Sequence, residues 1–400
     1  MSKPWPILPL RDLCEDFKKD IVDGPFGSNL KRAHYTNDGV PVLKIQNIKP
    51  FEIKLHKMDY VSEKKAEELN RHSFQKGDII MTKLGNPLGV SAIVEYLDNG
   101  IIVADLVRIR AQKINTKFLC YQLNSPKIKA HINSLQKGTT RPRVRITIVR
   151  DIPIVVPPLA EQQRIVKTLD KAFENVENLF EQKSTELNNS LQILESYRNE
   201  IFLSPKDNWK KGSLGEFFNT STGNTPPKKD IENYGSFIPL VKPPELTGGT
   251  IISAKDGLSE IGAKVARTLL PNSILVSCIG NLGKIGINTI PVAFNQQINA
   301  IHPDESKAIP RFMFHQTLSA FFRDQLVSAS SGTTIFMVNK SKFNEMEILL
   351  PPLSEQKGIV SVLDTLAQGV SELSLIFETE LKSLYELKQS ILQEAFNGNL

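Results

Sequence analysis

Residues 157–170 read PPLAEQQRIVKTLD, and residues 351–364 read PPLSEQKGIVSVLD. The two segments lie 194 positions apart, and the similarity continues without a gap to Phe202 and Phe396. The same offset aligns Gly138-Thr139-Thr140 with Gly332-Thr333-Thr334, and weaker matches lie farther upstream. A repeat of this length indicates a duplicated domain and not a solenoid unit. The sequence therefore predicts a domain followed by a tail, each present twice.

Each tail is predicted to be one long helix. The proline pairs at 157–158 and 351–352 exclude helix before them and suit a first turn. Apolar residues then recur every three or four positions, which is typical of a coiled-coil seam. The residues that we assign to this seam are Val166, Leu169, Phe173, Val176, Phe180, Leu187, Leu194, Val360, Leu363, Val370, Phe377, Leu381, Leu384 and Ile391. A helix of this length would measure roughly 60–65 Å.

The two tails are expected to pair with each other. Neither helix can bury its seam alone, and an antiparallel pair would place the two domains at opposite ends of a spacer. The matched lengths and seams favour this arrangement over two helices that each pack on their own domain, although a partner protein's helices could join the bundle. The predicted segments are 1–156 and 207–350 for the domains, and 157–206 and 351–400 for the helices.

The fold class is predicted to be α+β, with two domains of mixed helix and strand content. Both domains hold short apolar runs that are separated by Gly, Pro and Asn turns. The segment 146–156 is predicted to be one of these strands. A parallel βαβ series with a phosphate-binding loop is not expected.

Composition narrows the class of protein. The chain has 400 residues, 40% of them hydrophobic and 23% charged, which is globular and long enough for two to four domains. Uncharged apolar runs fall far below the roughly 18 residues that a membrane span needs, and no secretory signal is expected. The three cysteines are far apart in sequence, so we expect no disulfide framework and no zinc site. We expect a cytoplasmic, metal-free protein.

Catalytic motifs are weak. The glycine-rich stretch 280–286 fits neither a dinucleotide nor a P-loop pattern. The acidic stretch 303–307 is too compressed to spread Mg²⁺ ligands over separate strands, and the six histidines show no ligand spacing. No GxSxG nucleophile elbow is present. We therefore predict no catalytic residue and no metal site in this chain.

The net positive charge favours nucleic-acid binding, and it is distributed unevenly between the two predicted domains. Residues 1–156 have a net charge of +10, whereas residues 207–351 have a net charge of +2. In an extended segment Arg141, Arg143 and Arg145 would share one face, where guanidinium groups can contact phosphates or guanine edges. The structural alternative is a charged, exposed edge strand.

Further candidate DNA contacts are basic, amide or hydroxyl side chains. In the first domain they are Ser28, Lys31, Arg32, Lys44, Gln46, Asn47, Lys83, Asn86, Thr139 and Thr140. In the second they are Asn224, Lys228, Lys229, Lys242, Asn281, Lys284, Gln296, Gln297, Thr333, Thr334 and Lys340.

The duplicated proline boxes, the helices after them, the Gly-Thr-Thr before each box and the openings at Trp5 and Trp209 resemble one family. They are similar to the specificity (S) subunit of Type I restriction-modification systems, over essentially the whole chain. The resemblance implies two target-recognition domains that each read half of a split, asymmetric sequence in double-stranded DNA, with helices that fix the gap. It also implies a non-catalytic subunit in a prokaryotic cytoplasm.

The resemblance further implies partners. Two methyltransferase (M) subunits would use S-adenosylmethionine, and restriction (R) subunits would use ATP and Mg²⁺, so the cofactors would belong to the partner chains. Two alternatives stay open at this point. One is a coiled-coil scaffold that carries two protein- or ligand-binding modules without a nucleic-acid role. The other is a self-sufficient restriction or modification enzyme, which the missing motifs disfavour.

Overall fold

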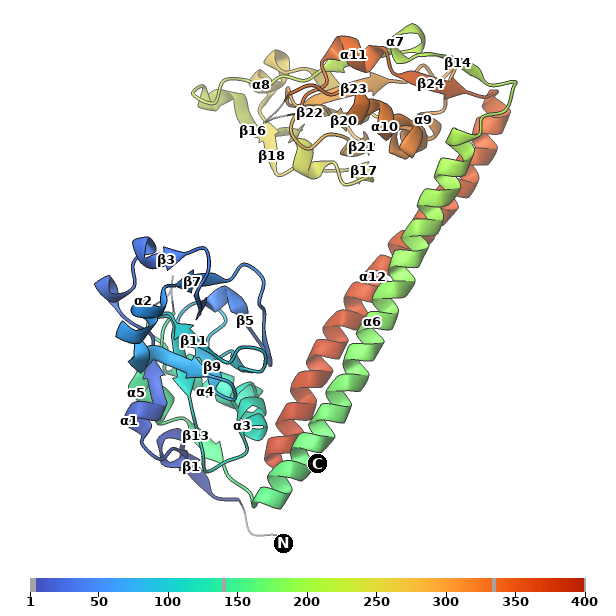
Figure 1. The fold of residues 1–400 in the computed structure, drawn as a ribbon. Coiled ribbons are helices and arrows are strands. Elements are labelled where there is room, and N and C mark those ends of the chain that lie inside the picture. Colours follow the sequence, from blue (N-terminus) through green and yellow to red (C-terminus); the bar gives the residue numbers. More distant parts are fainter. Residues whose placement is uncertain (1–4, 139–141, 333–335, 399–400) are drawn as a thin grey trace. The chain divides into compact units, whose positions relative to one another are not determined.

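Two long helices begin where the proline pairs end. In a computed structural model that describes residues 5–138, 142–332 and 336–398, α6 runs over Leu159–Leu203 and α12 over Leu353–Asn397 (Figure 1). Proline is tolerated just before a helix because its missing N–H has no intrahelical acceptor there. The predicted helices and their starts are therefore confirmed.

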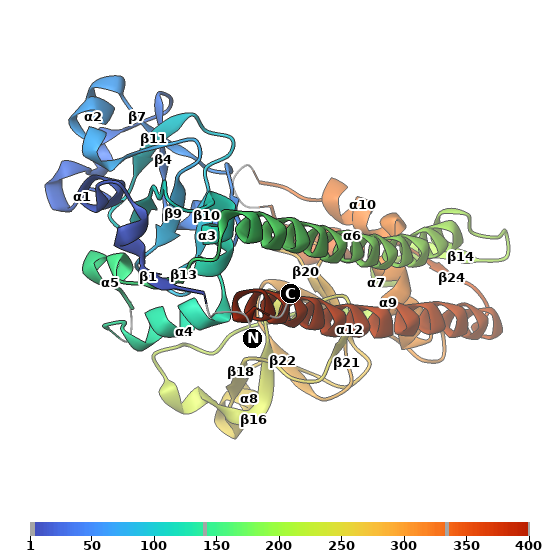
Figure 2. The same ribbon diagram turned by 90° about the horizontal axis from the view of Figure 1, so that it is seen from below.

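The chain divides into two units, each made from one mixed domain and parts of both long helices. Unit 1 comprises Met1–Gln182 and Thr379–Leu400, and unit 2 comprises Lys183–Glu378. In each unit the two helices lie side by side and run in opposite directions (Figures 1 and 2). The predicted α+β class with an antiparallel helix pair is confirmed.

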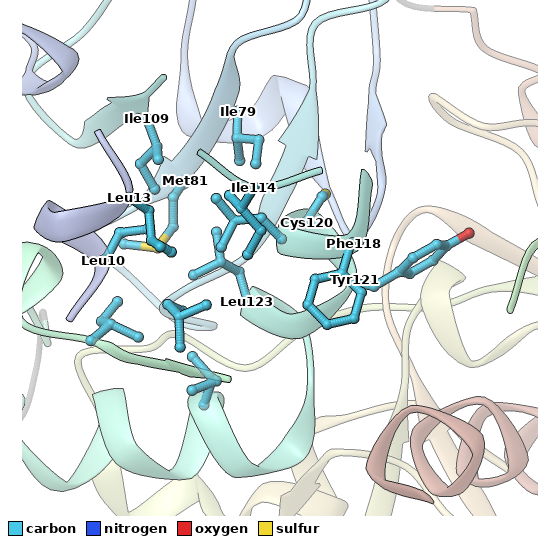
Figure 3. Close-up of a cluster of buried hydrophobic side chains, with 14 of the residues drawn as sticks. Leu10, Leu13, Ile79, Met81, Ile109, Ile114, Phe118, Cys120, Tyr121 and Leu123 are labelled. Atoms are coloured by element: carbon cyan, nitrogen blue, oxygen red, sulfur yellow. The ribbon is translucent and has the colours of Figure 1, made fainter. Parts of the chain in front are cut away.

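The core of unit 1 joins the start of α6 to the end of α12. Leu169 and Phe173 of α6 are buried in the same cluster as Leu392 and Phe396 of α12. The cluster extends into the domain, where the side chains drawn in Figure 3 lie between strands and the helices beside them. Each long helix therefore contributes one of its ends to this core.

The core of unit 2 mirrors this arrangement. Leu194 and Phe202 near the end of α6 share a buried cluster with Leu363 near the start of α12. Since apolar burial stabilises by roughly 25 cal/mol per Å², these seams supply packing that neither helix could provide alone. Helices that pack only on their own domain are excluded.

The domain of unit 1 contains two main sheets with the strand orders β10-β9-β12-β2 and β3-β7-β4-β11-β8. Strand pairs are antiparallel except β4 with β11. The strands are β1 (Ile7–Pro9), β2 (Ile21–Asp23), β3 (Tyr35–Thr36), β4 (Val40–Leu43), β5 (Ile48–Lys49), β6 (Glu52–Ile53), β7 (Asp59–Val61), β8 (Ser73–Gln75), β9 (Ile79–Thr82), β10 (Ser91–Ile93), β11 (Asn99–Ile102), β12 (Leu106–Ile109) and β13 (Pro153–Val155). The helices are α1 (Phe17–Asp20), α2 (Glu63–Glu68), α3 (Thr116–Leu123), α4 (Pro126–Ser134) and α5 (Ile146–Arg150).

The domain of unit 2 has the sheets β15-β23-β20-β21-β17 and β18-β16-β22-β19. Its strands are β14 (Lys210–Ser213), β15 (Asn219–Thr222), β16 (Tyr234–Val241), β17 (Thr250–Ile251), β18 (Asp256–Leu258), β19 (Thr268–Leu269), β20 (Ile274–Ser277), β21 (Ile285–Asn288), β22 (Val292–Phe294), β23 (Ile298–His302) and β24 (Glu347–Leu350). Its helices are α7 (Leu214–Phe217), α8 (Glu260–Val265), α9 (Pro310–Leu318), α10 (Ala320–Ser328) and α11 (Lys340–Asn344).

The prediction of one strand over 146–156 is wrong. The first half is the helix α5, and only β13 is extended. The β-branched residues suggested a strand, but local propensity is weak against tertiary packing. Val149 is fully buried, and Arg150 donates to the Ile21 carbonyl at 2.8 Å while lying over the Phe17 ring.

The glutamine of each proline box ties its helix to the domain before it. Gln162 accepts a hydrogen bond from the backbone N–H of Asn115 at 2.8 Å, and Gln356 accepts one from Ile309 at 2.8 Å. Each side chain also donates to the carbonyl of the first proline of its box, at 2.8 and 2.9 Å. Both are buried, so these bonds satisfy amides that would otherwise destabilise the core.

The aspartate that ends each box makes a second tie. Asp170 accepts a hydrogen bond from the Tyr121 hydroxyl at 2.6 Å, and Asp364 accepts one from His315 at 2.7 Å as well as an ion pair with Arg311. Burial lowers the pKa of His315 to about 4, although the bond to Asp364 acts against this. The same joint is therefore built twice with different side chains.

Aromatic pairs complete both joints. The ring of Phe396 at the end of α12 packs 5.3 Å from that of Phe118 on α3, and Phe202 at the end of α6 packs 5.5 Å from Phe312 on α9. The 194-residue offset relates Phe118 to Phe312 and Phe202 to Phe396. Residues that are equivalent in the sequence repeat therefore make equivalent contacts in the two units.

Helix α12 is the one helix of the described residues that is long and apolar enough to cross a membrane, with a mean hydropathy of 1.4 over 18 residues. The sequence argument considered only uncharged runs and so missed this stretch. Leu363 is buried in the core of unit 2, and Val360 and Val370 pack against that core. The apolar face of α12 thus takes part in packing inside this unit.

Candidate nucleic-acid interface

Lys137 and Arg143, both exposed, form an isolated antiparallel bridge in the first domain, and Gly138, Pro142 and Val144 flank them. Lys137 and Arg143 exchange two backbone hydrogen bonds of 2.9 and 3.0 Å. Val144, which follows, donates to the Lys83 carbonyl at 3.0 Å. These bonds hold the bridge against the loop that follows β9. We call residues 137, 138 and 142–144 the first hairpin.

The second domain carries an equivalent bridge between Ser331 and Met337, which together with Gly332, Phe336 and Val338 we call the second hairpin. Ser331 and Met337 exchange two backbone hydrogen bonds of 3.0 and 2.9 Å. Val338 donates to the Cys278 carbonyl at 2.9 Å, just as Val144 bonds to Lys83. The two hairpins therefore share one backbone pairing pattern.

The side chains at equivalent positions differ in charge. The pairs are Lys83 and Cys278, Lys137 and Ser331, Arg143 and Met337, and Arg145 and Asn339. All four cations belong to the first domain, and their counterparts carry no charge. The uneven net charge of the chain is thus concentrated where the two domains are structurally most alike.

The exposed face of the first hairpin is set by alternation. Val144 is buried, whereas Arg143 and Arg145 on either side of it are exposed, as expected for an extended segment. The extended segment ends there, because α5 begins at Ile146. Among the described residues, Arg143 and Arg145 have no carboxylate partner, so both guanidinium groups are available to an anion.

A cleft of about 560 Å³ lies beside the first hairpin. Its lining includes Asp23, Phe26, Lys137, Arg143 and Arg145. The combination of an aromatic ring and several basic groups suits a nucleic acid, which offers phosphates and base edges.

Lys83 lies at the base of this cleft and is almost buried. Its ammonium group pairs with Asp23 at 2.7 Å and lies 4.4 Å from the centre of the Phe26 ring. A buried charge requires such compensation. Lys83 is therefore held by Asp23 and Phe26, whereas Lys137, Arg143 and Arg145 are the exposed cations among the described residues that line the cleft.

Two other candidates of the first domain are tied up locally. Lys44 pairs with Asp59 at 2.5 Å and lies over the Tyr35 ring. Asn47 is buried, accepts from the Lys44 N–H at 3.0 Å and donates to a carbonyl of the same turn. The amide of Asn47 therefore shapes a turn and cannot reach DNA while that turn is intact. The candidates that lie exposed are Ser28, Lys31, Arg32, Gln46 and Asn86.

Three candidates of the second domain lie in neighbouring loops and bond within them. Asn224 accepts from the Arg267 N–H at 2.6 Å, Thr225 donates to Gln296 at 2.8 Å, and Gln297 accepts from Asn295 at 2.9 Å. The Cys278 N–H donates to the Gln297 carbonyl at 2.8 Å, which brings this loop to the second hairpin. The loop amides thus surround the hairpin base.

The remaining candidates of the second domain are lysines and one asparagine. Lys242 pairs with Asp256. Lys284 is half-buried, and Lys228, Lys229, Asn281 and Lys340 are exposed. Thr139, Thr140, Arg141, Thr333 and Thr334 lie outside the described residues.

The predicted seam residues divide into three groups. Leu169, Phe173, Val176, Leu194 and Leu363 are buried. Those of intermediate burial are Val166, Leu187, Val360, Val370, Phe377, Leu384 and Ile391. Phe180 and Leu381, both 41% exposed, are the most open members of the seam.

The described residues contain no group of three or more His, Cys, Asp or Glu side chains that could hold a metal ion. Burial raises the pKa of Cys14, Cys120 and Cys278 to about 12. A thiol of such high pKa is a poor nucleophile at neutral pH.

The residues selected from the sequence carry basic, amide or hydroxyl groups. The apolar Met337 and Phe26 and the acidic Asp23 were therefore passed over. The 194-residue offset relates Met337 to Arg143, so the repeat itself carried the signal.

Comparison with known proteins gives consistent matches. A family model described as Type I restriction modification DNA specificity domain matches residues 3–189 and 206–375. The Type I restriction enzyme MjaIX specificity subunit of Methanocaldococcus jannaschii is 22% identical, over 100% of this chain and 94% of the relative.

Solved structures share the fold. A chain from a structure of the type I R-M system, 20% identical, aligns with a TM-score of 0.75 over 100% of this chain and 99% of the other. The HsdS subunit from Thermoanaerobacter tengcongensis, also 20% identical, aligns with a TM-score of 0.53 over 100% and 98%.

Proposed function

Because the chain belongs to the Type I restriction-modification DNA specificity family, we propose that each of its two domains reads one half of a bipartite, asymmetric DNA sequence. The observation that carries this proposal is the pair of hairpins, which share one backbone and differ in side-chain charge. A shared backbone favours a shared docking mode, and different side chains favour different half-sites. Arg143 and Arg145 would contact phosphates or guanine edges in the first half-site.

The long helices are proposed to set the gap between the half-sites. Each is a continuous helix of 45 residues, and their ends pack in both units. We also propose that they dock two methyltransferase subunits, and through them restriction subunits. S-adenosylmethionine, ATP and Mg²⁺ would then be bound by those partners, and this chain would be non-catalytic.

Mapping DNA methylation in cells with and without this gene tests the proposal. We expect one asymmetric motif with a fixed gap to lose its methylation when the gene is deleted. An unchanged methylation pattern would contradict the proposed function. The scaffold alternative predicts that unchanged pattern.

A paired insertion tests the ruler separately. Seven residues placed after Ser184 and seven after Glu378 keep a heptad register and lengthen each helix by about 10 Å. This corresponds to roughly three base pairs at about 3.4 Å each. The gap should grow by about that amount while both half-sites are retained, and an unchanged gap would exclude the ruler. Circular dichroism shows whether the variant folds.

A further inference from the structure

The second hairpin presents an apolar side chain where the first presents a guanidinium. Met337 occupies the position of Arg143, since both residues pair with the other side of their hairpin and with the loop beside it. The isolated bridges pair Met337 with Ser331 and Ile279, and Arg143 with Lys137 and Leu84. This correspondence rests on backbone geometry and is independent of residue type.

The side chain of Met337 faces away from the core. Val338 is buried in unit 2, and successive side chains of an extended segment point to opposite faces. Met337 is 43% exposed, so its side chain is accessible to a ligand. An exposed thioether at a position that holds an arginine in the other domain indicates a contact surface.

The surroundings of Met337 exclude the contact chemistry of the first domain. Cys278 and Ser331 replace two lysines, and the side chain of Asn339 accepts from the Lys342 N–H at 2.9 Å, so it caps α11. No cation remains at the four equivalent positions. An apolar group on a base edge would find a polarizable, flexible partner in Met337, and the nearest cation along the chain is the exposed Lys340.

We propose that Met337 reads thymine in the half-site of the second domain through contact with the C5-methyl group in the major groove. The methyl group is the one apolar feature that distinguishes a base pair in that groove. Arg143 would read its own half-site through polar contacts. The inference rests on the proposed function and adds a base identity and a reading residue to it.

The test compares thymine with uracil, because uracil lacks only the C5-methyl group. Every thymine of the mapped target is replaced in turn by uracil in short duplexes. Binding to the full chain, co-purified with its methyltransferase partner, is measured by fluorescence anisotropy. We expect one position, in one half-site only, to weaken binding roughly four-fold, as for one buried methyl-sized group.

The variant Met337→Ala should bind the thymine duplex about as weakly as the wild type binds the uracil duplex, and should no longer respond to uracil at that position. Its salt dependence should be unchanged, whereas Arg143→Ala should reduce the slope by about one if the arginine contacts a phosphate. Phe336→Ala is the matched control, because that residue is exposed in the same hairpin but precedes Met337 on the opposite face. It should keep the uracil response.

Four outcomes would overturn the inference while leaving the proposed function intact, and the first three concern the bases. They are a half-site of the second domain without thymine, a wild type that tolerates uracil everywhere, and a Met337→Ala variant that keeps the full uracil response. A variant that loses its methyltransferase partner but keeps base discrimination would assign Met337 to a protein interface and would also overturn it. If the complex has no specific site at all, the proposed function itself fails.

Discussion

We predict that the single substitution Arg198→Leu in α6 stabilises unit 2. Its side chain is 7% exposed, and its Nε is buried without a hydrogen-bond partner. The residue at the equivalent position of α12 is Leu392, which is fully buried. Unit 1 thus shows that this joint accommodates a leucine.

The magnitude follows from the desolvation of the guanidinium. Burial, with the nearby charge of Arg323, lowers the pKa of Arg198 from 12.5 to about 10. A tenfold change corresponds to about 1.4 kcal/mol, so burial disfavours the charged form by about 3 kcal/mol. Arg198→Leu removes that penalty but loses part of the packing of the longer side chain. We expect the free energy of unfolding to rise by roughly 2 kcal/mol, or Tm by roughly 4–8 °C.

Tryptophan fluorescence reports this change in the full chain. Trp209 is buried in the core of unit 2 and its ring lies 6.4 Å from that of Phe202. A Trp5→Phe background removes the tryptophan of unit 1, so thermal and urea unfolding then follow unit 2. The reverse exchange, Leu392→Arg, should destabilise unit 1.

Arg323→Leu is the comparison variant, because Arg323 is half-buried, pairs with Glu195 at 2.6 Å and contributes a smaller share of the lowered Arg198 pKa than burial does. Its removal should change Tm little, as for most surface ion pairs. A Tm of Arg198→Leu equal to or below that of the background would refute the reasoning, since it would mean that the buried guanidinium stabilises the joint.

Three further substitutions probe the joints and the cleft. His315 has a pKa of about 4 in the folded protein, below its ordinary 6.5, so its contribution to stability is present above pH 6.5 and is lost as pH falls toward 4. His315→Tyr should flatten this part of the pH profile of stability measured by urea unfolding. A profile as steep as that of the wild type would contradict the prediction. Phe396→Ala should lower the free energy of unfolding of unit 1 by about 3–5 kcal/mol, because it leaves a cavity beside Phe118. Calorimetry measures this change, and a clearly smaller loss would contradict the prediction. Lys83→Met should lower the free energy of unfolding by about 3–5 kcal/mol, because it leaves the Asp23 carboxylate unpaired. Adding Asp23→Asn should recover most of this loss. A double variant as unstable as the single one would argue against the ion pair.

The long-range organisation could be predicted from the sequence because local features that occur twice determine it. Proline pairs mark where α6 and α12 start, and the 194-residue offset relates their seams. The roles of Gln162 and Gln356 were not predictable in the same way. The identity of the two residues marks them as equivalent, but the N–H groups that donate to them, those of Asn115 before α3 and Ile309 before α9, are brought there by the tertiary fold.

The predictions from sequence were wrong or incomplete where tertiary contacts determine the secondary structure or the availability of a side chain. Residues 146–149 are all β-branched, yet together with Arg150 they form a helix in which Val149 packs into the core of unit 1. Among the candidate contacts, composition suggested which side chains could bind DNA but could not separate the free Arg143 from Lys83, whose charge is compensated by Asp23. That distinction depends on residues that are distant in the chain.

The division of the chain has a consequence for the order of synthesis. Unit 2 is one continuous segment, Lys183–Glu378, whereas unit 1 combines Met1–Gln182 with Thr379–Leu400. Since Leu392 and Phe396 complete the core of unit 1, the surface around Phe118 stays uncovered until the codons for these two residues are translated. At about 5–20 residues per second, the remaining two hundred or so residues take roughly 10–40 s. During that interval the first domain made is the last to be finished, and its apolar surface is open to chaperones or to the matching helix end of another nascent chain.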